Sequence, residues 1–294
     1  MTDASSATRL RLDLSYDGTR YAGWAKQREH DTVQAQLEQA LAVVLRLSEA
    51  PTTFCAGRTD SGVHASAQVV HVDVPAASIV VSMARLAIQL RGVLPEDIVV
   101  HTVSPAPEGF DARFSPLWRA YEYTIDDRGI GVDPLRRHQV VEHFKHLDES
   151  LMNEASQQLL GMHDFAAFCK PRERATTIRT LMELSWSRTP DGLLQARVQA
   201  DAFCHSMVRF LVGSMIPVGE GAKPIDWPAS MLQSKVRDIG FNLAPAHGLV
   251  LVDVRYPADD QLAARATQTR ALREPLSSQS EDADDDAAGQ SSLN

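Results

Sequence analysis

The sequence lacks the short motifs by which several large enzyme classes are identified. It contains no Gly-x-x-x-x-Gly-Lys phosphate loop, no Gly-x-Gly-x-x-Gly after a predicted strand, no His-Glu-x-x-His and no Gly-x-Ser-x-Gly. Each of these motifs supplies one piece of chemistry, from phosphate binding to an activated serine. Their absence weakens nucleotide hydrolase, dehydrogenase, zinc hydrolase and esterase interpretations together.

Cysteine and long apolar runs are also scarce. The three cysteines, Cys55, Cys169 and Cys204, include no Cys-x-x-Cys pair, so we expect core residues rather than disulfides or a structural zinc site. The segment Met1 to Ala7 has neither the basic start nor the apolar run of a secretory signal. No stretch approaches the roughly 20 apolar residues that span a bilayer. We therefore expect a cytoplasmic protein with no membrane contact.

Positive charge is in deficit, because the formal net charge of the 294 residues is −9. The segment from Glu274 to Asn294 carries six of the acidic residues and no lysine or arginine, which leaves −3 on the rest of the chain. A body this close to neutral can still carry a local basic face. The charge therefore neither proves nor excludes binding to RNA.

The most informative stretch is Ala56-Gly-Arg-Thr-Asp-Ser-Gly-Val-His-Ala65, which we call the signature loop. Strand-like segments flank it at 52–56 and 68–74, which predicts that Asp60 lies on a tight loop at the end of a sheet. An ordinary hairpin turn is the alternative, since Asp, Ser and Gly are common turn residues. A plain turn, however, does not need Arg58, Thr59 and His64 as well.

Apolar periodicity predicts strands and helices in both halves of the chain and hence an α+β fold. We expect strands at 9–16, 52–56, 68–74, 97–103, 117–125, 177–188, 193–202 and 249–256, and helices at 31–48, 78–91, 148–160, 205–218 and 228–237. Asp31 and Ser78 are the predicted caps of the first two helices. The predicted organisation is a flexible arm (1–8), an N-terminal half (9–126), a connection (127–146), a C-terminal half (147–257) and a polar, then acidic tail (258–294) that is largely disordered.

Asp60 is the strongest candidate for nucleophilic or acid–base chemistry, provided that a cation keeps its carboxylate ionised. Arg58 lies two residues upstream, and Arg209 lies within an apolar helical segment. A charge in such a segment costs free energy unless it is paired, which favours an ion pair between Asp60 and Arg209. The alternative for Arg209 is an arginine whose stem merely covers apolar surface.

Other residues are suited to binding RNA. Tyr121, on a predicted strand, could stack on a base, although aromatic residues also pack well in strands. A polar loop with two exposed-looking aromatics carries Phe110, Arg113 and Phe114, and a basic loop carries Lys170, Arg172 and Arg174. Either loop could contact phosphates, which position an RNA without reading its sequence. Simple solvated loops remain the alternative.

Several strings together resemble the tRNA pseudouridine synthase A family over roughly Leu10 to Pro257. They are the signature loop, Tyr16-Asp-Gly-Thr-x-Tyr-x-Gly-Trp24, Val33-Gln-x-x-Leu-Glu38, Leu94-Pro-x-Asp-Ile98, Phe110-x-Ala-Arg-Phe-Ser115, Arg119-x-Tyr-x-Tyr123, Gly161-x-His-Asp-Phe-x-x-Phe168, Met207-Val-Arg209 and Ala244-Pro-Ala-x-Gly-Leu249. Departures occur at Ala25, Gln89 and Phe210, and none of them affects Asp60, Tyr121 or Arg209.

The resemblance implies a pseudouridine synthase fold, with two related α/β halves that share a central, mostly antiparallel sheet flanked by helices. It implies an isomerase without cofactor or metal that converts uridines 38, 39 and 40 of the tRNA anticodon stem-loop to pseudouridine. It also implies a homodimer whose cleft binds tRNA. Attack of the aspartate at C1′, attack at C6 and a glycal route remain open as mechanisms.

The resemblance also assigns roles to individual residues. Asp60 is the catalytic aspartate, and Arg209 is its charge partner. Tyr121 stacks on the uracil and is a candidate proton acceptor. Arg58 acts in flipping the base out of the stem, and Leu249 lines the pocket.

Two other functions compete with the synthase. A non-catalytic protein that binds or folds tRNA would use the same cleft but would not need Asp60. A metal-dependent RNA hydrolase needs a carboxylate cluster, and the signature loop holds no second carboxylate. The synthase is therefore the leading hypothesis.

Overall fold

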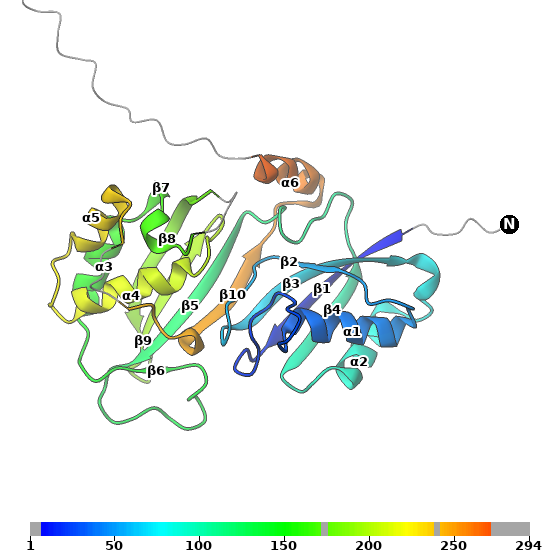
Figure 1. Cartoon of the computed structure of the whole chain (residues 1–294), viewed down its shortest axis with the longest axis horizontal. Helices are drawn as coiled ribbons and strands as arrows, with labels where there is room; N and C mark the ends of the chain where they lie inside the picture. The colour runs from blue at the N-terminus through cyan, green and yellow to red at the C-terminus, as the bar shows by residue number, and fades with distance from the viewer. Residues whose placement is uncertain (1–6, 172–175, 238–241, 272–294) are drawn as a thin grey trace, which may run out of the picture.

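The computed structural model describes residues 7–171, 176–237 and 242–271. Its strands are β1 (Ala7–Tyr16), β2 (Thr53–Cys55), β3 (His64–Pro75), β4 (Ile98–Pro105), β5 (Trp118–Asp126), β6 (Val141–Glu142), β7 (Gly161–Asp164), β8 (Ile178–Arg188), β9 (Leu194–Ala200) and β10 (Leu249–Arg255). Within these residues the strands form one sheet in the order β4-β1-β3-β10-β5-β9-β8-β7, with β2 beside β3 and β6 beside β5 (Figure 1). Only the pairs β3–β10 and β5–β6 are parallel in this part of the chain. The predicted α+β fold with a mostly antiparallel central sheet is confirmed.

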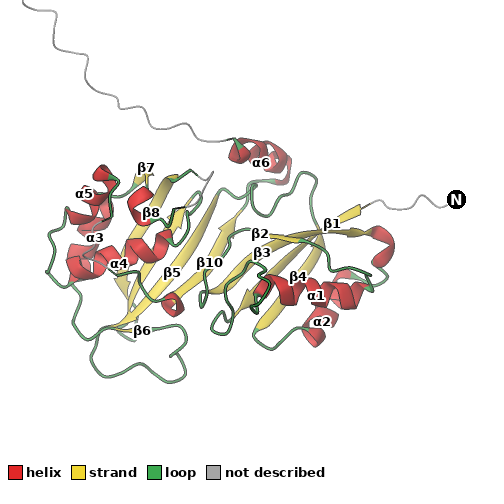
Figure 2. Ribbon diagram, viewed as in Figure 1, coloured by secondary structure: helices red, strands yellow, loops and turns green. Residues whose placement is uncertain are grey.

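The two halves of the chain share this sheet. Strand β10 comes from the C-terminal half, yet it lies between β3 and β5 of the N-terminal half. The helices are α1 (Val33–Leu45), α2 (Met83–Val93), α3 (Glu149–Gln157), α4 (Met207–Gly219), α5 (Trp227–Ser234) and α6 (Leu262–Arg270). Figure 2 shows α1 and α2 at the β4–β1–β3 end of the sheet and α3, α4 and α5 at the opposite end.

The main core lies between the sheet and the five helices α1 to α5. The predicted apolar face of β1, with Leu10, Leu12 and Leu14, is fully buried there. Helix α1 contributes its predicted apolar stripe, which includes Leu37 and Leu41. Burial of this apolar surface is what holds the helices on the sheet.

The first two helices begin later than predicted. Helix α1 is capped by Thr32, whose side chain accepts from the backbone N–H of Ala35, and not by Asp31. Helix α2 is capped in the same way by Ser82, whereas Ser78 ends a short 3₁₀ turn. In both cases the cap has the extended backbone that lets its oxygen reach the first-turn amides. The predicted caps, Asp31 and Ser78, lie one and four residues before the residues that cap these helices.

A second, smaller core lies on the other face of β3. Side chains alternate between the faces of a strand, so Val70 points into the main core whereas Val69 packs with Phe110 and Leu262. Leu262 belongs to α6, which lies within the segment assigned to the polar tail. A 3₁₀ turn (Asp259–Gln261) and α6 therefore follow position 258, with Leu262 packed on the body, and the expectation of a tail is corrected for these residues. Residues 272–294, the rest of the predicted tail, lie outside the described residues.

Gly23 packs its backbone directly against the signature loop. Its φ of +102° is unfavourable for other residues, and a Cβ atom there would lie 2.8 Å from the carbonyl oxygen of Thr59. The next amide, that of Trp24, donates to the same oxygen at 3.1 Å. A side chain at position 23 would therefore displace the backbone next to Asp60.

We expect Gly23→Ala to lower the free energy of unfolding by about 2 kcal/mol, from backbone strain and the close approach together. The control is Gly92→Ala in α2, where a Cβ atom meets nothing within 4 Å. That change should raise the free energy of unfolding by about 0.5–1 kcal/mol. Urea unfolding of both variants measures the difference, and equal stability of the two would contradict this account of Gly23.

Candidate active site

The signature loop joins β2 to β3 and is held mainly through its backbone. Gln68 on β3 accepts from the N–H of Gly57 at 3.3 Å and donates to the same residue's carbonyl oxygen at 2.8 Å. The hydroxyl of Tyr16 lies 2.8 Å from the Thr59 hydroxyl. These bonds hold the loop at Gly57 and Thr59, on both sides of Arg58, so the backbone at Asp60 has a defined position.

Arg119 on β5 is a buried cation that binds carbonyl oxygens. Its guanidinium donates to Ala56 at 3.0 and 3.1 Å, to Asp201 at 2.6 Å and to Arg113. Burial lowers the pKa of this side chain below its ordinary value. An arginine nevertheless stays protonated in proteins, so its donors remain available. Arg119 thus ties the start of the signature loop to the 110–114 loop and to the end of β9.

Asp60 forms the predicted ion pair with Arg209. Arg209 Nη1 lies 3.2 Å from Asp60 Oδ2, and its Nε donates to the carbonyl oxygen of Ala244 at 2.7 Å. The same carboxylate oxygen accepts from Ser206 Oγ at 2.7 Å, and His205 Nε2 lies 3.5 Å from Oδ1. The Asp60 side chain is 21% exposed, so the paired carboxylate remains accessible. Three residues around the start of α4 therefore surround this anion.

Tyr121 lies beneath the signature loop on β5. A Cβ atom on Gly57 would be 3.2 Å from its hydroxyl oxygen, and its ring meets Phe203 edge-on with centroids 5.1 Å apart. Burial raises the pKa of the Tyr121 hydroxyl well above its ordinary value, and the negative charge of Asp60 adds to this effect. The side chain is therefore a neutral phenol at physiological pH, held by an aromatic neighbour.

Leu249 begins β10, the strand between the signature loop's own strand and that of Tyr121. Along this strand, Leu251 pairs with Ala65 on one side and with Tyr121 on the other. Leu249 itself is buried in the main core. The topology therefore brings the loop, Tyr121 and the start of β10 to the middle of the sheet.

The residues expected to contact RNA differ in exposure. Arg58 is exposed on the signature loop, and Lys170 is exposed where its backbone N–H donates to the carbonyl oxygen of His205. Arg113 is exposed and lies over the ring of Phe114 at 5.0 Å. Arg172 and Arg174 lie outside the described residues.

Phe110 corrects the expectation of two exposed aromatics. It is only 1% exposed and packs in the second core, with its ring 5.0 Å from that of Tyr256. Leu262 of α6 covers it from a distant part of the chain. In this position Phe110 supports the 110–114 loop from below and does not face solvent.

Cys169 and Cys204 correct the expectation that all cysteines are free. They form a disulfide with Cα atoms 5.8 Å apart, although 35 residues separate them in sequence. Cys55 is the free, buried cysteine that was predicted, and burial raises the pKa of its thiol to about 12. The disulfide anchors the turn that leads to His205 and Ser206.

Sequence reasoning missed Phe203, His205 and Ser206. All three lie within the four residues before the Met207-Val-Arg209 string, and their proximity to that string was the only available signal. Nothing in their spacing relative to Asp60 indicated contact, because the two segments are about 145 residues apart.

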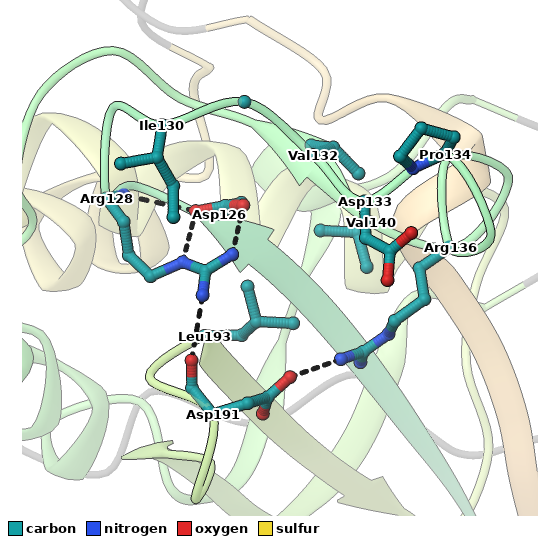
Figure 3. Close-up of a pocket in the computed structure, with 11 residues that line it drawn as sticks. Asp126, Arg128, Ile130, Val132, Asp133, Pro134, Arg136, Val140, Asp191 and Leu193 are labelled. Atoms are coloured by element: carbon teal, nitrogen blue, oxygen red, sulfur yellow. Dashed lines mark hydrogen bonds and ion pairs between the residues drawn. The ribbon is translucent and has the colours of Figure 1, made fainter.

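A separate pocket of about 480 Å³ lies at the connection between the halves. Its arginines are paired with carboxylates, Arg128 with Asp126 and Arg136 with Asp191 (Figure 3). None of the predicted site residues lines it. Across the described ranges, no group of three or more His, Cys, Asp or Glu side chains is arranged to hold a metal ion, and no helix is long and apolar enough to cross a bilayer.

Comparison with known proteins gives a consistent result. A family model described as tRNA pseudouridine synthase matches residues 14–115 and 155–257. The chain is 53% identical over 266 residues to tRNA pseudouridine synthase A of Streptomyces griseus, covering 90% of this chain and 94% of that protein. It is 54% identical to the protein of the same name from Frankia casuarinae, covering 94% and 98%. The Mycobacterium leprae protein of that name is 45% identical, covering 92% and 96%.

The role of Arg119 can be tested by Arg119→Lys. A lysine cannot reach the three carbonyl groups together, so buried oxygens lose their donors at a cost of about 3 kcal/mol in the free energy of unfolding. The control is Arg197→Lys on neighbouring β9, whose surface ion pair with Glu122 should contribute less than about 0.5 kcal/mol. Thermal unfolding compares the two variants. If Arg119→Lys has the same melting temperature as Arg197→Lys, the hydrogen bonds from Arg119 to the three carbonyl groups do not stabilise the loop.

Proposed function

Because the chain belongs to the tRNA pseudouridine synthase family, we propose that it isomerises uridines 38, 39 and 40 of the tRNA anticodon stem-loop, with Asp60 as the catalytic group. The observation that carries this proposal is the accessible Asp60 carboxylate in its ion pair with Arg209. A non-catalytic protein that binds or folds tRNA would not need Asp60. We further propose that the enzyme acts in the cytoplasm.

The reaction is an isomerisation in which atoms and electrons balance. The C1′–N1 bond breaks, the uracil turns and C5 bonds to C1′, while C5 loses a proton and N1 gains one. A nucleophilic or basic carboxylate must be anionic to take part. Arg209 and Ser206 both donate to this carboxylate, and hydrogen bonds that involve a charged group are stronger than those between neutral groups.

Tyr121 serves as the platform for the uracil in this proposal and accepts the proton in the final step. Phe203 holds the ring edge-on, so the platform keeps its orientation when the base arrives. Burial keeps the hydroxyl neutral in the free protein, and only a phenolate can accept a proton. In the proposed step Tyr121 therefore gives its own proton to N1 and, as the phenolate, takes the proton from C5. Leu249 forms an apolar wall of the base pocket.

The substrate uridines lie within a stem, so at least those in base pairs must leave the stack before they react. We assign this task to Arg58, whose exposed side chain extends from the signature loop two residues before Asp60. Arg113 with Phe114, Lys170, Arg172 and Arg174 then contact the backbone of the stem-loop. Phosphate contacts of this kind set position and affinity and not sequence preference.

We also propose that the enzyme is a homodimer, as the family resemblance implies. Large apolar side chains along the connection support this, with Ile130 75%, Leu135 91% and Phe144 85% exposed. Covering such side chains with a second copy of the chain removes apolar surface from water, which favours association.

The catalytic assignment is tested with tRNA carrying tritium at uracil C5, because formation of the new bond releases that hydrogen. Wild type should release tritium, and Asp60→Ala should lower the rate by at least about 1,000-fold. Asp73→Ala, which removes a carboxylate from a surface ion pair with Arg9, is the control and should keep full activity.

tRNA substrates that carry a single uridine, at position 38, 39 or 40, then show which of these positions the enzyme modifies. Equal rates for wild type and Asp60→Ala would remove the aspartate from the mechanism. A wild type that binds tRNA without releasing tritium would instead favour the binding protein.

The dimer is tested by light scattering of a Leu135→Asp, Phe144→Asp variant. We expect wild type at twice the chain mass and the variant at the mass of one chain, because the new charges would have to be buried. Val80→Asp is the matched control, since Val80 is 80% exposed but lies outside the connection. Circular dichroism checks that all three proteins are folded. A variant that remains dimeric would show that the interface lies elsewhere.

A further inference from the structure

Ser206 occupies the position directly before α4 but does not act as a helix cap. A serine at this position normally accepts a hydrogen bond from an amide of the first turn. Here the Ser206 side chain makes no such bond, and its backbone has φ 62° and ψ 14°, in the left-handed region. Its hydroxyl instead donates to Asp60 Oδ2 at 2.7 Å. A buried serine is thus held in an unfavourable conformation that directs it at the carboxylate.

The two oxygens of Asp60 have different surroundings. Oδ2 accepts from both Ser206 Oγ, at 2.7 Å, and Arg209 Nη1, at 3.2 Å. Oδ1 has only the more distant His205 Nε2, at 3.5 Å, among the contacts of the described residues. Two donors on one oxygen restrict rotation of the carboxylate about its last torsion. The other oxygen is thereby left in a defined place.

We propose that Ser206 is a positioning residue that holds Asp60 through Oδ2 and leaves Oδ1 as the oxygen that reacts. The inference rests on the proposed function of Asp60 and adds the atom that acts and the residue that selects it. Arg209 alone supplies one donor at 3.2 Å, which neutralises charge but leaves the carboxylate plane free to turn. The shorter bond from Ser206 supplies the second point of attachment.

The turn that carries Ser206 is anchored on both sides. Cys204 is bonded to Cys169, and the carbonyl oxygen of Cys204 accepts from the N–H of Met207 at 3.0 Å. Between them, the carbonyl oxygen of His205 accepts from the N–H of Lys170 at 3.0 Å. These anchors determine the backbone at residue 206, so the hydroxyl keeps its direction. Strained residues held in this way by their surroundings are characteristic of functional sites.

The test compares Ser206→Gly, Ser206→Asn and Ser206→Ala in single-turnover tritium release at saturating enzyme. Glycine suits a positive φ and removes the hydroxyl, so Ser206→Gly deletes the donor and can keep the backbone conformation at this position. We expect both Ser206→Gly and Ser206→Ala to react roughly 10- to 100-fold more slowly than wild type, as loss of a hydrogen bond to a charged group implies. Affinity for tRNA, measured by filter binding, should be unchanged.

The Ser206→Asn variant distinguishes two roles of Ser206, donation of a hydrogen bond to Asp60 and maintenance of the backbone turn. It tolerates the left-handed region and has an N–H donor, so Ser206→Asn should react faster than Ser206→Gly. If the residue mattered only for the turn, glycine would do at least as well as asparagine. Ser214→Ala is the matched control on the same helix, because its buried hydroxyl donates to the carbonyl oxygen of Leu211 and not to Asp60. It should react at the wild-type rate.

Failure of this inference and failure of the proposed function give different results. A wild-type protein that releases no tritium contradicts the proposed function. An active wild type with Ser206→Gly at the same rate contradicts the role of Ser206 alone. So does a Ser206→Gly variant that is slower only because it binds tRNA more weakly.

Discussion

The ion pair between Asp60 and Arg209 is the interaction on which the arrangement of this site depends. Its partners are 149 residues apart, one on a loop of the N-terminal half and the other on a helix of the C-terminal half. An arginine in an apolar helix is costly unless it is paired, so the contact with Asp60 stabilises Arg209 at its position in α4. The site therefore exists only when both halves have packed on their common sheet.

The residues that hold the signature loop in place, Gln68 and Arg119, form hydrogen bonds with backbone groups more than with side chains. Gln68 bonds both backbone groups of Gly57, and Arg119 bonds the carbonyl oxygens of three separate segments. Backbone contacts of this kind determine the path of the signature loop and leave its side chains free for substrate. This explains how a loop with an exposed arginine and an accessible carboxylate can nevertheless have a defined position.

Local patterns predicted most elements, since β1 to β5, β8 to β10 and the helices α1, α3, α4 and α5 lie close to where periodicity indicated them, whereas the short strands β6 and β7 were not predicted. The errors share a physical cause. Phe110 is buried because Leu262 covers it. The segment around α6 is ordered because Leu262 packs on the surface formed by Phe110 and Val69. Cys169 and Cys204 are brought together by the packing of η2 (Ala166–Phe168) beside α4. Each of these outcomes depends on a partner that sequence proximity does not reveal.

By itself, the sequence determined the α+β class, the signature loop with its aspartate, and the candidate partners of that aspartate. Periodicity and short strings suffice for this, because they reflect contacts within one helix turn or one strand. The tertiary structure decided that Arg209 and not Arg58 pairs with Asp60, and that Ser206 and His205 join them. Hydrogen bonds require atoms about 3 Å apart, and across 145 residues only the packing of the sheet and α4 sets such a distance.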